Sequence, residues 1–391
     1  MKKSLKIALA HDYLMEYGGA ERVVEALHEI FPEAPLYVAF KDKKALGIHW
    51  QNFKNWDIRE SWLTEIPFYK KLFSPLRIWA PNYFADFDLS EYDVVISSSN
   101  AYFAKAVRVR KNDPAGRPDA IQICYCHTPA RSLYGYSTMT DWESKPITNF
   151  FGKLINHYLR VVDVKIAQKV DYFIANSAET ASRIQKFYRR DSTVIYPPVN
   201  VPTSWEKVAE LRKSVRTKNT EEYYVYVNRL AFAKHPELAV QACTKLQLPL
   251  KVVGNGKMLP NLKEMAGPDI EFLGAVRDEQ LYKLYAGAKA LIYPVEDEDF
   301  GIVPIEAMSY GVPVIAHRSG GPKETIIEGK TGLFFDDLAV DGVVQAIQKF
   351  EKLNAAGKFD AQKIYEHTRQ FSEEQFKKKI LAFVEKCTTP S

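Results

Sequence analysis

The sequence predicts an α/β protein made of two Rossmann-like, doubly wound domains that face each other across a cleft. Its 391 residues are more than one ordinary domain needs. Short apolar runs alternate with amphipathic helical patterns along most of the chain, which favours parallel sheets covered by helices. The alternation lapses into a charged stretch at 200–222 and then begins again. We therefore predict two domains that join within this stretch.

The first domain is expected to span residues 1–200. The segments 19–31 and 177–188 have the apolar spacing of amphipathic helices. Apolar runs with the length of buried strands lie around them. These expected strands are 6–10, 93–99, 121–127, 171–177 and 193–198.

The second domain is expected to span residues 201–371 and to repeat the same alternation. One more amphipathic helix, 372–387, follows after the second sheet is complete. We expect this last helix to pack back on the first domain. The strands of the second domain are expected at 223–230, 250–256, 270–274, 290–294, 312–316 and 332–335.

The composition is that of a soluble globular protein, with 46% hydrophobic and 26% charged residues. No apolar run approaches the about 18 residues of a membrane span. The apolar run before His11 is shorter than the core of a signal peptide. The cysteines have no paired spacing that indicates zinc or a disulfide framework. We expect a cytoplasmic protein.

The net charge of +5 lies wholly in the N-terminal half of the chain. A basic half suits an anionic partner such as a lipid phosphate or a membrane surface. A solvated basic face without any partner gives the same count, so both interpretations stay open. Nucleic acid is disfavoured, because no arginine-rich tract or recognition motif accompanies the charge.

Candidate functional residues lie where the expected strands end, because ligands of open α/β sheets bind at the carboxyl ends of the strands. Two sheets that face each other form a cleft, the usual place for a site. Gly18 and Gly19 open a helix whose first amides favour an anion, although a plain turn would use the same residues. His127 ends an apolar strand and can offer its imidazole to a sugar hydroxyl, although most lone histidines are structural.

Two basic residues flank a turn from strand to helix in the second domain. Arg229 ends the strand, and Lys234 precedes Pro236 in the first turn of the helix. Two fixed cations beside a helix N-terminus form a site for a doubly charged phosphate group. Two solvated side chains are the plainer interpretation. Gly254 and Gly256 also follow a strand, but the rest of a dinucleotide fingerprint is missing, which disfavours NAD.

The segment 296–316, EDEDFGIVPIEAMSYGVPVIA, combines an acidic loop with a short apolar helix. Pro304 suits the first turn of a helix at 303–310. The carboxylates of Glu298 and Glu306 are then expected at one mouth, where each can accept two hydroxyls of a vicinal diol. The amides expected to face a phosphate or sugar oxygen at the helix start are those of Gly301, Ile302 and Val303.

The candidates together resemble the retaining family 4 glycosyltransferases, which have the GT-B fold of two Rossmann-like domains. The stretch 298–301 with Glu306 resembles the E-x7-E motif of that family. The segments 320–326 and 332–335 are similar to its C-terminal signature. The resemblance covers nearly the whole chain, and the other candidate residues fall where the family has its ligand contacts.

The resemblance implies a role for each candidate in the second domain. Glu306 would bind the nucleotide ribose, and Glu298 would bind hydroxyls of the donor hexose, helped by the backbone at Phe300 and Gly301. The two basic residues, Arg229 and Lys234, would neutralise the departing diphosphate.

Two candidates of the first domain would complete the site. Gly19, beside Gly18, would lie against the phosphates, and His127 would contact the sugar near the reacting carbon. His235 departs from the family pattern, which more often has glycine or arginine there, so the conformation of that turn is in question.

Five segments of the N-terminal half look closer still to the O-antigen mannosyltransferases of the WbaZ type. This narrower resemblance implies GDP-mannose as the donor and a role in surface polysaccharide synthesis. The segments are HDYL with GGAERV, VISSS, ICYCHTP, FIANS and VIYPPV.

The expected chemistry is transfer of a hexose with retention of anomeric configuration and without a metal or cofactor, since no Asp-x-Asp occurs in a suitable setting. Fixed donors at the leaving diphosphate would supply the main stabilisation, and one such donor is worth about 2.7–4 kcal/mol. We expect a front-face displacement in which the leaving phosphate accepts the proton of the acceptor. A UDP-sugar donor, a nucleotide-sugar epimerase and a non-catalytic binding protein remain as alternatives.

The stretch 62–84 mixes aromatic and basic residues and bears on the acceptor. Such a basic-aromatic helix can rest on a membrane face, while packing of its rings into the core is the other interpretation. On the first interpretation the protein is peripheral at the inner face of the plasma membrane and the acceptor is a polyprenyl-diphosphate-linked glycan. The residues concerned are Trp62, Phe68, Tyr69, Phe73 and Trp79 with Lys70, Lys71 and Arg77.

Overall fold

The computed structural model of the chain describes residues 5–100, 103–136, 146–217 and 221–389. The chain divides into two compact units. Unit 1 consists of Met1–Pro198 together with Phe376–Ser391, and unit 2 consists of Val199–Gln375.

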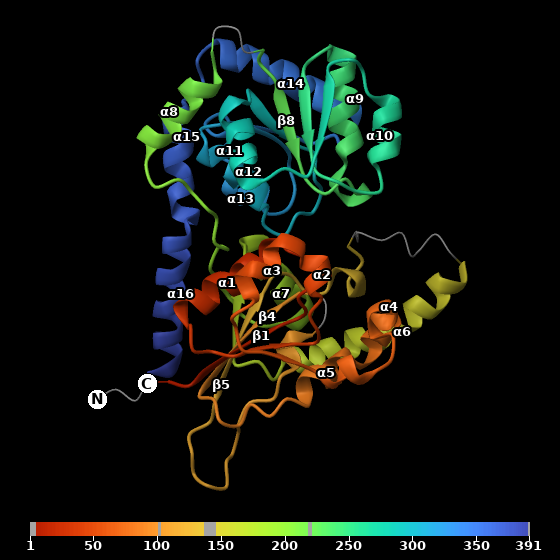
Figure 1. Cartoon of the computed structure of the whole chain (residues 1–391), viewed down its shortest axis with the longest axis vertical. Helices are drawn as coiled ribbons and strands as arrows, with labels where there is room; N and C mark the ends of the chain where they lie inside the picture. The colour runs from red at the N-terminus through yellow and green to blue at the C-terminus, as the bar shows by residue number, and fades with distance from the viewer. Residues whose placement is uncertain (1–4, 101–102, 137–145, 218–220, 390–391) are drawn as a thin grey trace. The chain divides into compact units, whose positions relative to one another are not determined.

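Unit 1 contains a parallel sheet, which has seven strands in the described part of the chain (Figure 1). The strand order is β3-β2-β1-β4-β5-β6-β7, so β1 pairs with β2 on one side and with β4 on the other. The strands are β1 (Ile7–His11), β2 (Leu36–Val38), β3 (Ile58–Glu60), β4 (Val94–Ser99), β5 (Ile121–Cys126), β6 (Tyr172–Ala175) and β7 (Thr193–Val194).

Helices and short 3-10 turns connect these strands. Two of the helices, α1 and α7, begin where their apolar spacing begins, and Ser177 caps α7 by accepting a hydrogen bond from the amide of Thr180. The elements are α1 (Gly19–Ile30), α2 (Lys43–Leu46), η1 (Gly47–His49), α3 (Trp50–Phe53), η2 (Trp62–Glu65), α4 (Tyr69–Leu76), η3 (Arg77–Trp79), α5 (Ala80–Ala85), η4 (Ala104–Ala106), η5 (Arg131–Leu133), α6 (Pro146–Ala167) and α7 (Ala178–Tyr188).

The last helix, α16 (Glu373–Thr388), belongs to unit 1 for most of its length. Phe376, Ile380 and Val384 recur on one side of the helix and are almost fully buried. They share a core cluster with residues of β1, β4 and α1, including Leu9 and Ile96. The C-terminal segment therefore completes the hydrophobic core of unit 1.

Unit 2 contains a second parallel sheet, which is covered by helices (Figure 1). The sheet has six strands among the described residues, in the order β10-β9-β8-β11-β12-β13. Its strands are β8 (Tyr224–Val227), β9 (Leu250–Val253), β10 (Ile270–Gly274), β11 (Ala290–Tyr293), β12 (Val314–His317) and β13 (Gly332–Phe335). Its other elements are α8 (Trp205–Val215), η6 (Phe232–Lys234), α9 (Pro236–Leu246), α10 (Leu259–Met265), α11 (Asp278–Gly287), α12 (Ile302–Ser309), α13 (Pro322–Thr325), α14 (Val340–Ala355), α15 (Ala361–Thr368) and η7 (Arg369–Phe371).

The predicted fold class, two Rossmann-like parallel sheets, is confirmed. The short strands β2 and β3 were not predicted, because three residues carry too little periodicity to be recognised. The charged stretch at 200–222 contains α8, whose one fully buried residue among those described is Val208. A helix with so little apolar surface lacks the pattern on which the prediction depended.

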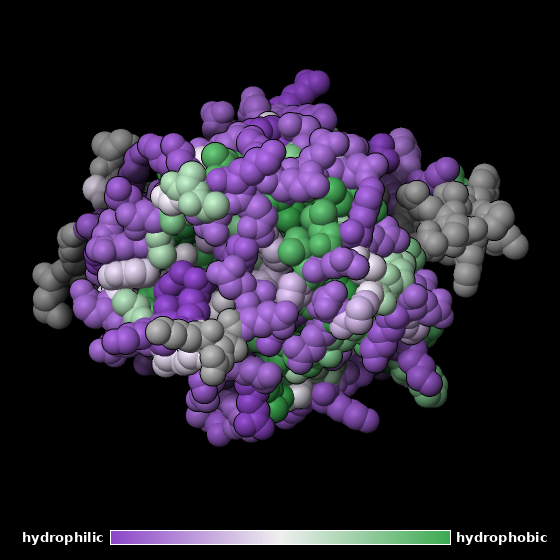
Figure 2. Space-filling view, turned by 90° about the horizontal axis from the view of Figure 1, so that it is seen from above, coloured by the Kyte–Doolittle hydropathy of each residue, from purple (hydrophilic) through white to green (hydrophobic). Residues whose placement is uncertain are grey.

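The described residues contain no helix long and apolar enough to cross a bilayer. The face shown in Figure 2 is covered mostly by hydrophilic residues, with hydrophobic residues in scattered patches between them.

Candidate functional site

The order of strands places one switch point in each sheet. In unit 1 the chain direction across the sheet reverses between β1 and β4, and in unit 2 it reverses between β8 and β11. Loops that leave neighbouring strands at such a point run to opposite faces and open a crevice at the carboxyl edge. The predicted site residues of both units follow these strands or their neighbours.

Lys234 and Glu298 form an ion pair in unit 2. Lys234 follows β8 and Glu298 follows β11, so the pairing of these two strands brings the residues together. Only 14% of the Lys234 side chain and 17% of the Glu298 side chain are exposed. The hydroxyl of Tyr293, at the end of β11, donates to the same carboxylate over 3.0 Å.

Tyr293 was not predicted as a site residue. It lies in an apolar run, and nothing in the sequence separates a core tyrosine from one that binds a carboxylate. Burial, followed by the charge of Glu298, raises the pKa of Tyr293 well above its ordinary value. The phenol therefore stays protonated and acts as a hydrogen-bond donor to Glu298.

The turn that carries Lys234 has a left-handed residue at His235, the position where the resemblance led us to expect glycine or arginine. His235 has a φ of 48°, in the left-handed region, and its Nδ1 lies 3.1 Å from the carboxylate of Glu237. The hydroxyl of Tyr226 donates to the carbonyl of Lys234 over 3.0 Å. These contacts hold the turn, while the side chain of Arg229 at its start is exposed.

Helix α12 begins at Ile302, one residue earlier than predicted, with Gly301 as its N-cap at a φ of 87°. The N-cap provides no side-chain hydrogen bond to the first turn, which contains the amides of Ile302 and Val303. Glu306 is 9% exposed and accepts a hydrogen bond of 3.2 Å from the hydroxyl of Tyr285.

Two further glycines let the backbone of their own loop pass close to the acidic loop that carries Glu298. A Cβ at Gly320 would lie 2.2 Å from the carbonyl oxygen of Glu298, and a Cβ at Gly321 would lie 2.4 Å from the backbone of Phe300. The amide of Gly321 donates to the carbonyl of Glu298 over 2.8 Å. The segment that resembles the C-terminal family signature thus acts as a backbone support for Glu298.

Gly254 and Gly256 have a packing role. A Cβ at Gly254 would lie 1.9 Å from the carbonyl oxygen of Asn228, and one at Gly256 would lie 2.0 Å from that of Leu230. These glycines therefore let the loop after β9 pass close to the loop that leads to Lys234.

In unit 1, Gly18 is the N-cap of α1, and Gly19 is its first residue. The amide of Gly18 donates to the carboxylate of Glu21 over 2.8 Å, which anchors the turn to the first turn of its own helix. Glu21 is 4% exposed. A nearly buried carboxylate thus binds the backbone amide of Gly18, one of the two predicted phosphate contacts.

His127 directly follows β5 and is 7% exposed. Its amide donates to the carbonyl of Ser99 over 3.0 Å, and its Nε2 lies 2.8 Å from the hydroxyl of Ser98. Burial and the nearby positive His11 lower the pKa of His127 to about 3. The imidazole is therefore neutral at physiological pH.

His11 ends β1 and Asp12 directly follows it at the same edge; neither was predicted as a site residue. His11 Nδ1 lies 3.2 Å from the carbonyl of Ser98, and its Nε2 lies 3.4 Å from the carboxylate of Glu21. Asp12 accepts hydrogen bonds of 2.8 Å from the amides of Asn100 and Ala104. A histidine and an acid at the end of a first strand, in the sequence ALAHDY, were a usable signal.

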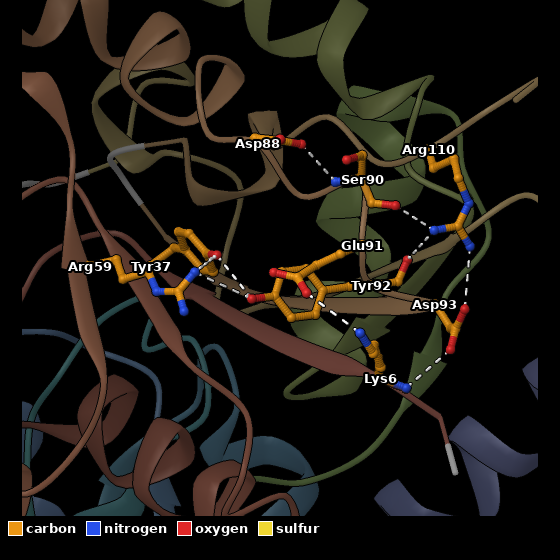
Figure 3. Close-up of polar contacts among 9 residues, drawn as sticks. All are labelled: Lys6, Tyr37, Arg59, Asp88, Ser90, Glu91, Tyr92, Asp93 and Arg110. Atoms are coloured by element: carbon orange, nitrogen blue, oxygen red, sulfur yellow. Dashed lines mark hydrogen bonds and ion pairs between the residues drawn. The ribbon is translucent and has the colours of Figure 1, made fainter. Parts of the chain in front are cut away.

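The groove at the opposite, amino edge of the unit 1 sheet has a volume of about 520 Å³. Polar groups in and around this groove pair with one another, as Figure 3 shows. Arg59 donates to the hydroxyl of Tyr37 over 2.7 Å, and Arg110 donates to the carbonyls of Ser90 and Tyr92. No predicted site residue lies there.

The described residues contain no group of three or more His, Cys, Asp or Glu arranged to hold a metal ion. Three of the four cysteines are buried, and all four are free.

Some residues of the basic-aromatic stretch 62–84 pack into the core, and others are exposed as a membrane contact would require. Trp62 stacks edge-on against Tyr83 and donates to Asp86 over 3.0 Å, so this ring is packed in the fold. Phe68 and Trp79 are 75% and 50% exposed. Tyr69 packs against the core, and Phe73 lies outside the described side chains.

Each unit matches one family model. Residues 17–202 match the model described as Glycosyltransferase Family 4, and residues 207–375 match the model described as Glycosyl transferases group 1. The boundary between the two matches lies near the boundary between the two units.

Several characterised or named proteins are similar to parts of the chain. The alpha-1,3/1,6-mannosyltransferase ALG2 of Kluyveromyces lactis is 27% identical over 61% of this chain and 53% of its own length. A GDP-mannose-dependent alpha-mannosyltransferase of Corynebacterium glutamicum is 36% identical over 32% of this chain and 30% of its own length. The chain thus spans about half or less of the length of these relatives.

Solved structures show the same fold at low identity. The Anabaena protein HepE, in complex with UDP and glucose, superposes with a TM-score of 0.67 over 98% of this chain and 100% of its own, at 18% identity. A sucrose-phosphate synthase of Thermosynechococcus elongatus superposes with a TM-score of 0.70 over 98% of this chain and 99% of its own, also at 18% identity.

Proposed function

Since the chain belongs to the glycosyltransferases of the group 1/family 4 type, we propose that it transfers mannose from GDP-mannose to a glycan acceptor with retention of configuration. The observation that carries this proposal is the Lys234–Glu298 ion pair at the switch point of unit 2. A cation for phosphate and a carboxylate for sugar hydroxyls are there fixed against each other, beside the start of α12.

The diphosphate of the donor would bind between Arg229, Lys234 and the amides of Ile302 and Val303. A charged diphosphate placed at a helix start gains from both the amides and the cations. When the sugar–phosphate bond breaks, negative charge develops on the leaving oxygen. Fixed cations stabilise that charge more than they stabilise the ground state, which lowers the barrier.

The two carboxylates would bind the two sugars of the donor. Glu306 would accept the ribose hydroxyls, with Tyr285 holding its second oxygen. Glu298 would accept hydroxyls of the mannose, with Tyr293 and Lys234 holding its orientation. The supports behind both carboxylates keep their acceptor atoms in place without the cost of ordering them on binding.

Transfer would take place on one face of the sugar. The acceptor hydroxyl attacks the anomeric carbon from the side on which the diphosphate leaves, and the departing phosphate oxygen takes the proton of that hydroxyl. The anomeric C–O bond to phosphate breaks as the new C–O bond forms, so atoms and charge balance without a nucleophile of the protein. Isolation of a covalent glycosyl-enzyme would contradict this route.

Mannose and guanine are proposed from the names of the relatives, which include GDP-mannose-dependent and alpha-1,3/1,6-mannosyltransferases. A thermal-shift panel of GDP, UDP, ADP and their sugars tests the choice. We expect GDP and GDP-mannose to raise the melting temperature, because a ligand that binds only the folded state stabilises it. A shift with UDP and none with GDP would contradict the proposed donor.

A matched pair of variants locates the binding in this panel. Lys234→Ala is expected to lose most of the GDP shift. Lys251→Ala is the control, since Lys251 forms an ion pair with Glu271 at 3.4 Å on the neighbouring strands of the same unit. Incubation of the protein with GDP-mannose alone separates a transferase from an epimerase, because only an epimerase would form a new nucleotide sugar without an acceptor.

The acceptor is proposed to be a polyprenyl-diphosphate-linked glycan of surface polysaccharide or O-antigen synthesis, reached at a membrane surface. Exposed apolar side chains on α4, η3 and α6 support the membrane contact, including Leu154 and Tyr158 at 56% and 53% exposure. Their exposed charged neighbours on α4 and α6 are basic, and the acidic residue among the described side chains of these helices, Asp163, is fully buried. Such a face suits anionic lipid headgroups.

Vesicle co-sedimentation tests this contact. We expect binding to vesicles that contain phosphatidylglycerol, weaker binding to pure phosphatidylcholine vesicles, and loss of binding in the triple variant Lys71→Glu, Lys153→Glu and Arg160→Glu. The control carries the same change of charge on unit 2, in Lys263→Glu, Lys330→Glu and Lys358→Glu. Equal binding by both triple variants would contradict a contact through α4 and α6.

A further inference from the structure

A continuous chain of hydrogen bonds connects the glycine turn to His127 inside unit 1. The amide of Gly18 donates to one oxygen of Glu21 over 2.8 Å, and the other oxygen lies 3.4 Å from Nε2 of His11. His11 Nδ1 lies 3.2 Å from the carbonyl and 3.1 Å from the hydroxyl of Ser98. That hydroxyl lies 2.8 Å from Nε2 of His127. All of these side chains are nearly fully buried.

The partners of His11 fix both of its protons. A carbonyl oxygen can only accept, so Nδ1 must carry a proton to bond to Ser98. The carboxylate of Glu21 likewise accepts, so Nε2 must also carry a proton. Burial alone would lower the pKa of His11, but the hydrogen bond and charge of Glu21, with the charge of Asp12, raise it above the ordinary value. His11 is therefore an imidazolium within this chain.

The direction of the next hydrogen bond follows from the charge of His11. The Ser98 hydroxyl lies beside the Nδ1–H of His11, so its oxygen faces a donor and its single proton is available to Nε2 of His127. If Nε2 of His127 also carried a proton, the Ser98 oxygen would face two donors, and its own proton would have no acceptor among the described residues. A buried hydroxyl without an acceptor is costly.

We propose that His11 and Ser98 are positioning residues that hold His127 as its neutral tautomer with the proton on Nδ1. His127 Nδ1 has no hydrogen-bonding partner among the described residues, so its N–H is left for a ligand. This inference rests on the proposed function only in assigning that N–H to an oxygen of the donor sugar. His127 then acts as a neutral hydrogen-bond donor and does not transfer a proton.

A neutral donor suits the charge that develops in the reaction. Positive charge grows on the anomeric carbon as the diphosphate leaves, so an imidazolium next to it would raise the barrier by repulsion. The positive charge is instead held on His11, which lies one hydroxyl away, bonds to the carboxylate of Glu21 and is stabilised by the charge of Asp12. The chain thus gives the sugar a fixed N–H without placing a cation against the reacting carbon.

Nitrogen-15 NMR of the full-length protein with labelled histidine tests the tautomer without any substrate. One-bond and two-bond couplings from the ring protons distinguish a protonated nitrogen from a bare one, and His127→Gln assigns the signals. We expect His127 to show a protonated Nδ1 and a bare Nε2 between pH 5 and pH 8, and His11 to be protonated on both nitrogens at pH 6. A proton on Nε2 of His127, or a doubly protonated His127, would overturn the proposal.

Substitution of Ser98 tests the positioning role. Ser98→Ala removes the hydroxyl, and we expect His127 to exchange between its two tautomers and kcat to fall about 10-fold with KM for the donor changed less than threefold. Ser97→Ala is the matched control, because Ser97 is equally buried and its hydroxyl contacts the carbonyl of Ile123 instead. Ser98→Thr keeps the hydroxyl and should keep the tautomer.

The two kinds of failure are distinguishable. A single Nδ1–H tautomer of His127 that persists in Ser98→Ala would overturn the role of Ser98, whatever the activity of the protein. Absence of transferase activity with every nucleotide sugar would contradict the proposed function, and the NMR result would stand independently of it.

Discussion

The two edges of the unit 1 sheet carry polar clusters of opposite kinds. At the amino edge, Arg59 donates to Tyr37 and stacks over its ring at 5.3 Å, and Arg110 binds the carbonyls of Ser90 and Tyr92 (Figure 3). At the carboxyl edge, the polar groups form a chain that ends on Nδ1 of His127 without a partner among the described residues. In the first cluster the arginines bind other groups of the same cluster. The second cluster ends in a hydrogen-bond donor.

The difference distinguishes a cluster that stabilises the fold from a cluster that can bind a ligand. A cluster in which charged groups bind carbonyls and one another gives stability and leaves nothing for a ligand. A cluster whose hydrogen bonds leave one atom without a partner holds that atom in a fixed direction, as a binding site requires. The carboxyl edge of unit 2 follows the second pattern, with Tyr293 and the backbone of Gly321 behind Glu298.

The largest expected effect is on activity at the carboxyl edge of unit 2. Lys234→Ala removes a fixed cation at the leaving phosphate, so we expect kcat/KM to fall about 10³-fold. The folded state should persist, with a fall in the free energy of unfolding of about 1 kcal/mol. Steady-state kinetics and urea unfolding measure the two quantities, and Lys251→Ala should leave both nearly unchanged. A loss of activity below tenfold would place the leaving group elsewhere.

At the amino edge the same comparison predicts an effect on stability. Arg110→Ala leaves the buried carbonyl of Tyr92 and that of Ser90 without their donor. We expect the free energy of unfolding to fall by about 3 kcal/mol. The kcat of the folded fraction should stay within twofold of the wild-type value. If Arg110→Ala lost activity while its stability was unchanged, the amino edge would not be a purely stabilising cluster, and the proposed difference between the two edges would be wrong.

A smaller effect on activity is expected at His127. His127→Ala removes the N–H donor and should lower kcat by about 10²-fold, while His127→Asn can place an amide N–H near the position of Nδ1 and should retain about tenfold more activity than His127→Ala. Kinetics at saturating donor compare the two variants. Equal activity in both would mean that the imidazole contributes by filling space and not by its hydrogen bond.

The two histidines predict opposite slopes of stability against pH. The pKa of His127 is lowered to about 3, so the folded state loses stability as pH falls below about 6.5, the ordinary value of histidine. The pKa of His11 is raised by Glu21 and Asp12 against burial, so its contribution is complete below about 6.5 and is lost as pH rises through the raised pKa. Each slope should reach at most about 1.4 kcal/mol per pH unit.

Urea unfolding across pH 4–9 measures both limbs of this curve. His127→Asn should flatten the acid limb and His11→Asn the alkaline limb. Unchanged limbs in both variants would show that other groups set the pH dependence.

The sequence predicted the sheets because buried parallel strands are continuous apolar runs, which are visible in one dimension. Lys234 and Glu298 became candidates for the same reason, since both lie in the loops that follow such runs. The support of these residues could not be predicted in this way. Two examples are the contact of Gly320 with the carbonyl of Glu298 and the contact of Ser98 with His11. Both depend on which strands are neighbours, and the apolar pattern does not determine the strand order.

The position of α16 has a consequence for how the polypeptide acquires its structure during synthesis. Residues 199–375 of unit 2 are continuous, so this unit can fold as soon as its own residues have left the ribosome. Unit 1 is different, because Phe376, Ile380 and Val384 fill part of its core. Residues 1–198 of unit 1 therefore wait, with an exposed apolar surface beside β1 and β4, until the residues of α16 that follow unit 2 in the chain have been translated and cover it.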